Sequence, residues 1–325
     1  PILDTAKLEP VKAISPTHYF GLSKEPGFRV TSKSGLTLKI ALRSLFRHKS
    51  ATIRIILCLT AIFILATVGI AGGIIADQTT KSWVEKAIGR DIALIAHQDV
   101  CNQYKLLLSK FYEAKEDSQF NYTDEEHLIS EDLLNQLGSI SGINIDVRLV
   151  LEEHVKEIQG YILGKETGAT IPVGDSREGE SLIVGVEPGK VVGEWFLDGR
   201  FLKSDQGREA VIGDTLALKM FSVPFNQSIR MFNSTFDLVG VCLDPINNGN
   251  VTYVPLKALQ NVTGVSKPNV VMVKIDPSAN RTEVLNQIRI KIEDFNPEFE
   301  IFELDEVLEK NLSFLGYIWS TIMFV

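Results

Sequence analysis

Residues 55–76 read IILCLTAIFILATVGIAGGIIA, and this stretch decides what kind of protein the chain encodes. It contains no charged side chain. A helix rises about 1.5 Å per residue, so about 20 apolar residues match the hydrocarbon thickness of a bilayer. The run therefore predicts a membrane-spanning helix. A second, shorter apolar run at 312–325 predicts the start of another membrane helix within residues 304–325, so we expect the chain to be part of a longer membrane protein.

The charge distribution predicts the orientation of the first helix. Residues 1–54 hold ten Lys or Arg against three Asp or Glu, a net charge of +7, so the rest of the chain, whose total is −8, carries −15. Positively charged flanks of membrane helices face the cytoplasm. We therefore expect residues 1–54 to be cytoplasmic and residues 77–311 to be extracellular. The acidic balance argues against a nucleic-acid surface, which needs clustered Lys or Arg.

The acceptor pattern for N-linked glycans agrees with this orientation. Asn-x-Ser/Thr occurs seven times, always after the first apolar run. The pattern marks glycosylated surface outside the cytoplasm, and the alternative is turn chemistry rich in Asn. The acceptors are Asn121, Asn226, Asn233, Asn250, Asn261, Asn280 and Asn311.

The segment before the membrane run, residues 36–54, predicts an amphipathic elbow helix. Apolar residues from Leu38 onward recur at helical spacing on one face, and Lys39, Arg43 and Arg47 recur every four residues on another. Such a helix lies flat on the inner leaflet, with its cations toward anionic headgroups. The alternative is a helix packed on a soluble partner.

Two glycines in the membrane run, Gly69 and Gly73, form a GxxxG step. Small residues at this spacing let a second helix approach closely. We therefore expect this face of the helix to make a helix contact within the bilayer.

The long segment after the membrane run, residues 77–303, predicts an extracellular α+β domain. Short runs rich in Val and Ile alternate with stretches of helical pattern, which fits one domain with an insertion or two small lobes. Residues 164–179 have the composition of a mobile loop that divides such lobes. The predicted strands are 92–96, 143–151, 182–186, 210–212, 236–241, 270–275 and 299–302, and the predicted helices are 130–137, 215–219 and 278–292.

Motifs for catalysis, cofactors or metals are not apparent. Residues 160–167, GYILGKET, differ from a phosphate loop, since three residues rather than four separate the glycines and Glu166 follows Lys165 in place of Ser or Thr. The acidic pairs at 125–126 and 152–153 predict solvated faces. The histidines are scattered without ligand spacing, so we expect ordinary surface or hydrogen-bonded side chains and no metal site. They are His18, His48, His97, His127 and His154.

Three cysteines remain. Cys58 lies in the membrane run and is expected to act as a small apolar residue. Cys101 and Cys242 are both predicted to be extracellular, where they either form a disulfide or stay as buried free thiols. Sequence spacing leaves these two alternatives open.

The order of these parts resembles the permease subunits of ABC transporters of the MacB/FtsX type. Those subunits have a basic amphipathic helix, here LKIALRSLFR at 38–47, then a membrane helix, a large external α+β domain and a second membrane helix. GEWFLDGRFL at 193–202 and EAVIG at 209–213 resemble the stretch that carries a Gly-Arg-Phe turn and then a strand ending in Ile-Gly. FDLVGV at 236–241 and YVP at 253–255 are similar to the strand pair that follows it.

The beginning of the chain is similar to the same family. EPVKAI at 9–14 resembles the cytoplasmic segment that closes a permease repeat after its last membrane helix. Residues 1–35 are then expected to be a linker or the tail of a preceding repeat. The alternative is an arbitrary cytoplasmic extension.

The resemblance implies a non-catalytic subunit that couples ATP hydrolysis to motion of its extracellular domain, for export, extraction or mechanotransmission. ATP and Mg would be held by a separate cytoplasmic ATPase. Lys39, Arg43 and Arg47 would anchor the elbow in the lipid bilayer. Gly69 and Gly73 would contact a second permease half, either another copy or the preceding repeat.

The same resemblance assigns Trp195, Gly199, Arg200 and Phe201 to holding a turn of the extracellular domain. Two other classes of function compete with this interpretation. One is a membrane-anchored, glycosylated binding or adhesion module without a motor. The other is an ectoenzyme, which the missing site chemistry disfavours.

Overall fold

The computed structural model describes residue 43 and residues 45–89, 91–110, 120–164, 168–195, 197–304, 313 and 321. The chain divides into two compact units, residues 1–68 and residues 69–325. The predicted linker at 1–35, residues 36–42 and 44 of the predicted elbow, and nearly all of the second apolar run lie outside the described residues.

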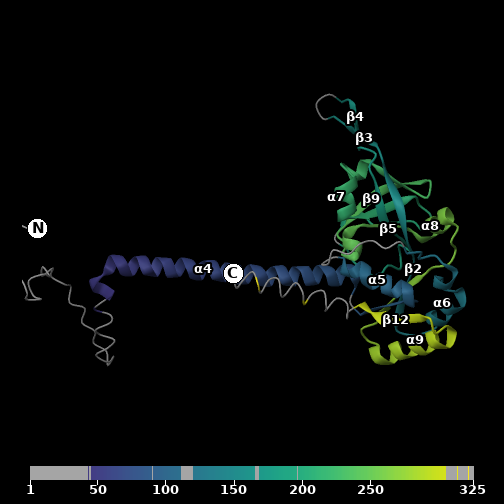
Figure 1. The fold of residues 1–325 in the computed structure, drawn as a ribbon, viewed down its shortest axis with the longest axis horizontal. Coiled ribbons are helices and arrows are strands. Elements are labelled where there is room, and N and C mark those ends of the chain that lie inside the picture. Colours follow the sequence, from purple (N-terminus) through teal and green to yellow (C-terminus); the bar gives the residue numbers. More distant parts are fainter. Residues whose placement is uncertain are drawn as a thin grey trace, which may run out of the picture. The chain divides into compact units, whose positions relative to one another are not determined.

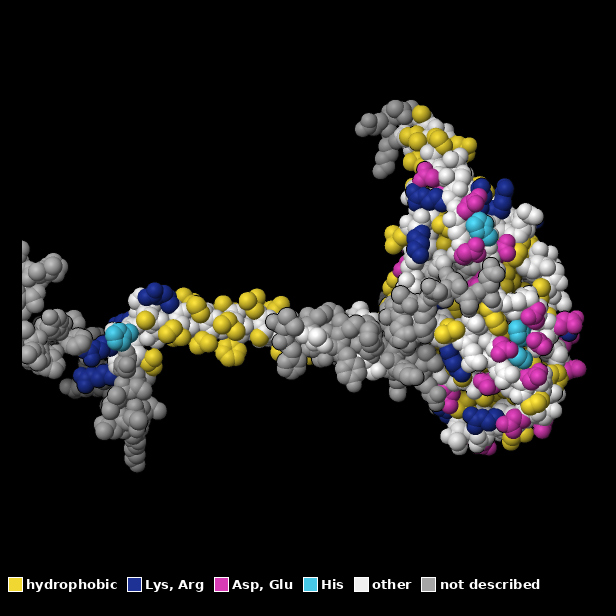
Figure 2. Space-filling model, viewed as in Figure 1, with side chains coloured by type: hydrophobic (Ala, Val, Ile, Leu, Met, Phe, Trp, Pro, Cys, Tyr) yellow, Lys and Arg dark blue, Asp and Glu magenta, His cyan; other side chains and the backbone are white. Residues whose placement is uncertain are grey.

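The membrane run of the sequence forms part of one helix, α4 (Lys49–Ile88). The most apolar 18-residue window of α4 has a mean hydropathy of 2.6, and none of that window is buried. Within the described part of the chain, α4 is the one helix long and apolar enough to cross a membrane. Figure 2 shows hydrophobic side chains along this helix, next to Lys and Arg near its start. Apolar surface of this extent is typical of contact with a bilayer or another protein.

The end of the predicted elbow is helical where it is described. Leu45, Phe46 and Arg47 have helical backbone and exposed side chains, and a turn follows at His48. The hydroxyl of Thr52 donates back across this turn to the carbonyl of Leu45 at 3.0 Å. This hydrogen bond connects the end of the elbow to the first turn of α4.

The second unit is built on a mixed sheet of ten strands (Figure 1). The strand order is β12-β1-β11-β2-β5-β10-β7-β9-β6, and β8 pairs with both β2 and β9. β10 pairs with β5 and β7 pairs with β9 in parallel, whereas the other pairs are antiparallel. β3 and β4 form a separate hairpin that projects from the domain. The strands are β1 (Ile92–His97), β2 (Ile143–Ile158), β3 (Gly160–Leu163), β4 (Thr170–Val173), β5 (Glu178–Val186), β6 (Leu197–Gly199), β7 (Glu209–Gly213), β8 (Ser228–Met231), β9 (Ser234–Cys242), β10 (Val251–Pro255), β11 (Val270–Ile275) and β12 (Phe299–Glu303).

Helices cover the sheet, and local caps define where several of them begin and end. Ser130 and Asn280 accept hydrogen bonds from the first-turn amides of α6 and α9, and Gly264 ends α8 in the left-handed conformation. The helices are α5 (Gln98–Ser109), α6 (Glu131–Gly138), α7 (Asp214–Met220), α8 (Leu256–Thr263) and α9 (Arg281–Phe295), with short turns η1 (Glu125–His127), η2 (Pro224–Asn226) and η3 (Ile246–Gly249).

The strand β2 connects two parts of the sheet. Its residues 143–148 pair with β11, and its residues 149–156 pair with β5. Where β2 changes its partner strand, the side chain of Asn269 supplies the backbone hydrogen bonds of Val150. It accepts from the amide of Val150 at 2.8 Å and donates to the carbonyl of Val150 at 2.6 Å. The long strand is thereby kept hydrogen-bonded throughout.

Two hydrophobic cores lie on opposite faces of β1 and β11. On β1, Leu94 belongs to the larger core, and Ala93 and Ile95 belong to the smaller one. The larger core includes buried residues of α4, α5, α7 and α8, and the smaller core includes those of α6 and α9. Successive side chains of β1 point to opposite faces, and both faces are buried. This explains why β1 is a continuous apolar run in the sequence.

Each strand and helix predicted within residues 77–303 overlaps an observed element, although α6 begins at Glu131 rather than Ser130 and α9 at Arg281 rather than Ser278. The predicted loop at 164–179 is wrong in part, because Thr170–Val173 is strand β4 and β5 begins at Glu178. The hairpin is rich in exposed apolar side chains such as Leu163, which short-range composition did not indicate. Pattern analysis also missed α5 and α8, although both bury apolar side chains at helical spacing, such as Val100, Tyr104 and Leu107 of α5.

Candidate functional site at the end of the long helix

The last turns of α4 are embedded in the α+β domain of the second unit. Val84, Ala87 and Ile88 are buried members of the domain's hydrophobic interior. The indole nitrogen of Trp83 donates to the carbonyl of Leu243 at 3.1 Å. Gly89, with φ of +94°, ends the helix and turns the chain into β1. The helix end is therefore held by packing and by hydrogen bonds to the sheet.

The segment 193–195 lies directly against this helix end. The amide of Glu194 donates to the carbonyl of Lys86 at 2.8 Å. A Cβ on Gly193 would stand 2.6 Å from the carbonyl oxygen of Ala87 and 3.1 Å from the ring of Trp195. Such distances are too short for any side chain, so glycine at 193 allows the two backbones to meet. We call residues 83–88 and 193–195 the helix junction.

Three aromatic rings fix the helix junction to the sheet. The indole of Trp195 stacks on Phe201, with ring centroids 5.2 Å apart and an interplanar angle of 13°. The same indole lies 4.9 Å from the ring of Tyr253 on β10. Stacked aromatic contacts of this kind contribute about 1 kcal/mol beyond their buried area. The junction therefore packs on β10 through the ring of Tyr253.

The predicted Gly-Arg-Phe turn completes this arrangement. Gly199 has φ of +84°, and a Cβ there would stand 2.5 Å from the carbonyl oxygen of Val239, so glycine is required. The guanidinium of Arg200 donates two hydrogen bonds to the carboxylate of Glu209, at 2.9 and 2.5 Å. This bond lowers the pKa of Glu209 and keeps it ionised. The structure thus brings Trp195, Gly199, Arg200 and Phe201 together, and their mechanical role stays a prediction.

A set of buried polar groups, which sequence reasoning missed, lies beneath the junction. The hydroxyl of Tyr253 donates to Asp244 at 2.6 Å, and the amide of Ile246 donates to the same carboxylate at 2.8 Å. Burial raises the pKa of Asp244 to about 6, and the bond from Tyr253 opposes that rise.

The second part of this set is an ion pair on β2. The guanidinium of Arg148 donates to Asp146 at 2.6 and 3.0 Å, and both side chains are almost fully buried. The amide of Val192, next to the junction, also donates to Asp146 at 3.3 Å. An Asp-x-Arg step inside an apolar strand places both side chains on one face, and this was the signal available in the sequence. We call Asp146, Arg148, Asp244 and Tyr253 the buried polar set.

The other predicted residues are placed as follows. Arg43 and Arg47 of the elbow are exposed, and Lys39 lies outside the described residues. Gly69 is exposed, with no described atom within 4 Å of a Cβ placed there, whereas Gly73 is buried. The bilayer contacts and the helix contact proposed for them stay predictions.

The cysteine alternatives are resolved toward free thiols in this structure. Cys101 and Cys242 are both unbridged and buried, and Cys58 is exposed on α4. Burial raises the pKa of Cys101 to about 12, which keeps this thiol protonated and unreactive.

The acceptor asparagines are mostly at the surface. Asn250 is half-buried and its amide donates to the carbonyl of Glu180 at 2.8 Å, whereas Asn311 lies outside the described residues. The exposed acceptors are Asn121, Asn226, Asn233, Asn261 and Asn280.

Two histidines that looked scattered in the sequence come together. The rings of His97 and His127 have centroids 4.9 Å apart, and both side chains are buried. Strand β1 and turn η1 bring them into contact, which sequence spacing could not indicate.

Comparison with known proteins identifies a family model that matches most of the chain. Residues 63–291 match the family model described as the MacB-like periplasmic core domain. The chain is similar to the periplasmic region of MacB from Actinobacillus actinomycetemcomitans, at 16% identity and a TM-score of 0.44, over 68% of this chain and 92% of that one. It is also similar to the extracellular domain of the noncanonic ABC-type transporter YknZ from Gram-positive bacteria, at 13% identity and a TM-score of 0.43, over 65% of this chain and all of that one. The comparison with curated proteins gave no significant match.

Proposed function

Because the chain belongs to the family of the MacB-like periplasmic core domain, we propose that it is a permease subunit of an ABC transporter, in which a separate cytoplasmic ATPase drives motion of the extracellular domain through α4. The output of that motion is export, extraction or transmission of force to an external partner. The chain itself is proposed to be non-catalytic, and ATP and Mg are proposed to bind the ATPase partner.

One observation carries this proposal: an apolar helix of membrane length ends inside the domain's hydrophobic interior. Its exposed apolar surface suits a bilayer, and its last turns are held by hydrogen bonds from Glu194 to Lys86 and from Trp83 to Leu243. A displacement of those last turns must carry the junction with it or break buried contacts. Aromatic stacking and the bond between Tyr253 and Asp244 then connect the junction to the centre of the sheet.

A separate ATPase is proposed on physical grounds as well. Residues 160–163 form strand β3 of an exposed hairpin, whereas a phosphate loop follows a buried strand and opens a helix. The sequence of residues 160–167 also departs from the phosphate-loop spacing, so we propose that the nucleotide binds a partner subunit. The second permease half, either another copy or a preceding repeat, is proposed to pack on α4 near Gly69 and Gly73.

The experiment that tests the motor is affinity purification of the full-length native protein in mild detergent. We expect an ATPase with a phosphate loop to co-purify and to hydrolyse ATP faster with the permease than alone. Recovery of the chain without an ATPase, under conditions that preserve other membrane complexes, would favour an anchored binding module instead.

A pair of glycine variants tests the helix junction within that complex. Gly193→Ala places a methyl group against the carbonyl of Ala87, whereas Gly189→Ala, four residues earlier, meets no atom within 4 Å. We expect Gly193→Ala to reduce stimulated ATPase activity or transport while the ATPase still co-purifies, and Gly189→Ala to leave both unchanged. Equal behaviour of the two variants would argue against transmission through this junction.

The elbow has its own test. Replacing Lys39, Arg43 and Arg47 with Glu removes three cations from the lipid surface, each worth about 1 kcal/mol, and adds repulsion. We expect weaker stimulation of the ATPase and a displaced elbow by accessibility labelling. Unchanged stimulation and labelling would remove the elbow from the coupling path.

Sidedness is tested by mass spectrometry of glycans on native material. Within the described residues, no hydrogen bond engages the side-chain amide nitrogens of Asn233, Asn261 and Asn280, so we expect glycans there first. Asn250 is expected to be modified least, because its amide donates to Glu180. Seven unmodified acceptors in a glycosylating host would contradict the extracellular assignment.

A further inference from the structure

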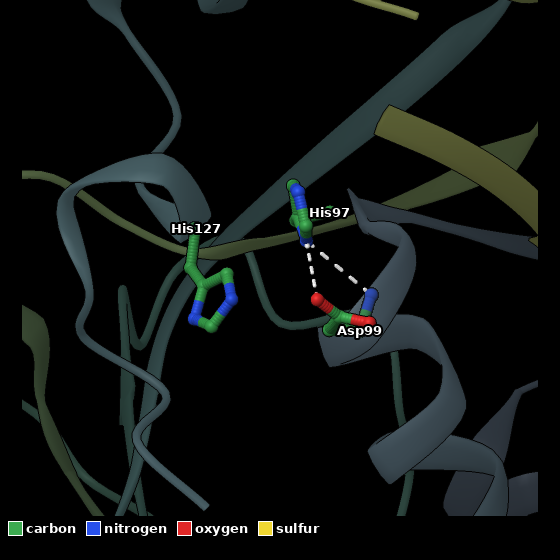
Figure 3. A group of neighbouring side chains, drawn as sticks. All are labelled: His97, Asp99 and His127. Atoms are coloured by element: carbon green, nitrogen blue, oxygen red, sulfur yellow. Dashed lines mark hydrogen bonds and ion pairs between the residues drawn. The ribbon is translucent and has the colours of Figure 1, made fainter. Parts of the chain in front are cut away.

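Two buried imidazoles and one carboxylate converge outside the helix junction. His97 ends β1 and caps α5, and His127 ends η1, with 4% and 3% of their surfaces exposed. Asp99, in the first turn of α5, places a carboxylate oxygen 3.6 Å from Nδ1 of His97. One ligand atom from each of the three residues lies within 4.8 Å of the others. Figure 3 shows the three side chains facing a common space.

The hydrogen bonds around the two rings direct lone pairs into that space. Nδ1 of His127 lies 2.9 Å from the carbonyl oxygen of Asn121, and because a carbonyl only accepts, this nitrogen carries the proton. Nε2 of His127 therefore carries a lone pair, and no hydrogen bond from the described residues reaches it. A backbone carbonyl that fixes the tautomer in this way is typical of metal-binding histidines.

The imidazole of His97 is oriented by its contacts with Asp99 and Glu298. Nδ1 of His97 carries a lone pair that accepts from the amide of Asp99 at 3.3 Å, a long hydrogen bond that a bound metal ion would replace. Its other nitrogen, Nε2, then carries the proton and lies 3.8 Å from the carboxylate of Glu298. Two nitrogen lone pairs and a carboxylate thus meet in a largely buried place, and such groups attract a cation between them.

We propose that His97, Asp99 and His127 bind a divalent transition-metal ion of the Zn²⁺ class, with a fourth position open to water. Two imidazoles and one carboxylate are a donor set that Zn²⁺ accepts in tetrahedral geometry. Asp99 is half exposed, so its side chain is free to adjust to the ion. Phe120 stacks on His127 and Phe299 meets the edge of His97, and these rings hold the imidazoles in place.

The ion would join two segments that are distant in the sequence. His97 and Asp99 belong to the junction of β1 and α5, whereas His127 belongs to the segment after residue 120 that leads into α6. A bound cation would therefore connect η1 to the end of β1 and the start of α5. This role is separate from the helix junction and does not depend on the proposed transport function.

A neighbouring group shares one member with this site. Asp124, Glu126 and His127 also come within 4.8 Å of one another through one ligand atom each. That group offers one imidazole and two exposed carboxylates, which suit harder, more weakly held ions. The buried pair of imidazoles favours the first group for Zn²⁺.

The test uses the full chain in detergent, without a polyhistidine tag, after treatment with EDTA. Titration with Zn²⁺ against a chromogenic chelator is expected to give one site per chain, and Zn²⁺ is expected to raise the thermal midpoint. His127→Gln and Asp99→Asn are expected to weaken Zn²⁺ binding at least about tenfold. His154→Gln is the matched control, because this exposed histidine contacts Glu178 and Glu180 and is not one of the three proposed ligands.

Folding and site identity are checked in the same variants. Circular dichroism and the thermal midpoint without metal are expected to match the parent chain, and a Co²⁺ spectrum with tetrahedral bands is expected to be lost with His127→Gln. The proposal is overturned if His127→Gln binds Zn²⁺ as tightly as the parent. It is also overturned if Asp124→Asn or Glu126→Gln abolishes binding while Asp99→Asn does not.

Discussion

The two cores of the domain differ in what they bury. The larger core surrounds the end of α4 and encloses the buried polar set of Asp146, Arg148, Asp244 and Tyr253. The buried members of the smaller core, beneath α6 and α9, are aliphatic apart from Phe299. An apolar core gains free energy from burial alone, whereas buried charges cost free energy unless each one is paired.

The difference suggests separate tasks for the two cores. The aliphatic members of the smaller core serve to exclude water, and its Phe299 also meets the buried ring of His97. The larger core holds charges whose positions are fixed by hydrogen bonds to β2, to β10 and to the segment before the helix junction. Buried polar groups specify one arrangement more strictly than apolar packing does, at some cost in stability.

The largest effect is expected from breaking the ion pair of the larger core. Arg148→Met leaves the carboxylate of Asp146 buried without its cation, so we expect a loss of about 4 kcal/mol in the free energy of unfolding. Urea denaturation measures this. The double change Asp146→Leu with Arg148→Met removes both charges and is expected to recover most of the loss. A double variant as unstable as the single one would show that the pair is needed for stability itself.

A slightly smaller effect is expected from the smaller core. Leu133→Ala opens a cavity beneath α6, where Leu133 is fully buried, and should cost about 3 kcal/mol. Leu134→Ala, at the neighbouring and only partly buried position, is the matched control and should cost less than half as much. Provided that the variant still folds, ATPase stimulation should be unchanged. Loss of stimulation in a folded Leu133→Ala protein would contradict the separation of tasks.

The third prediction concerns the pH dependence of stability, which we expect to come from Asp244 in the larger core. Because the pKa of Asp244 rises from 3.8 to about 6 on folding, the folded state binds this proton more tightly than the unfolded state. The free energy of unfolding should therefore fall as pH rises from about 4 to about 6, by up to about 3 kcal/mol. Asp244→Asn should remove this part of the pH dependence. An identical pH profile for the variant would contradict a buried, titrating carboxyl.

The smallest effect is expected outside both cores. Leu163 on the β3–β4 hairpin is 74% exposed, so Leu163→Ser should change the free energy of unfolding by no more than about 0.5 kcal/mol. The hairpin is separate from the main sheet in its hydrogen bonding. A loss above 1 kcal/mol in denaturant would mean that the hairpin packs on the domain in solution.

The sequence predicted the strands and helices of the fold better than it predicted the contacts between elements that are distant in the sequence. Runs such as 92–96 and 270–275 are apolar on both faces, so their burial in the sheet follows from composition alone. The turn at Gly199 was found through family resemblance, and its positive φ gives the physical reason for the glycine. Periodicity and turn residues carry this kind of local information.

Contacts between distant segments depend on the order of the strands and on how the turns fold back on the sheet. Arg148 and Tyr253 belong to one buried set because of strand order, and His97 reaches His127 because η1 folds onto the end of β1. Neither contact leaves a local spacing in the sequence. The β3–β4 hairpin was missed for a different reason, because its glycines and polar residues resemble the composition of a loop.

Strand β2 has a consequence for how the domain comes apart. It runs for 16 residues, a length of about 50 Å, and contributes one stretch of backbone hydrogen bonds to the β11 side and another to the β5 side. Melting of either side would strip bonds from the same strand and leave its other half without support. The domain should therefore unfold as one cooperative unit, and the amide protons in the middle of β2, around Leu149 and Val150, should be the last to exchange with solvent.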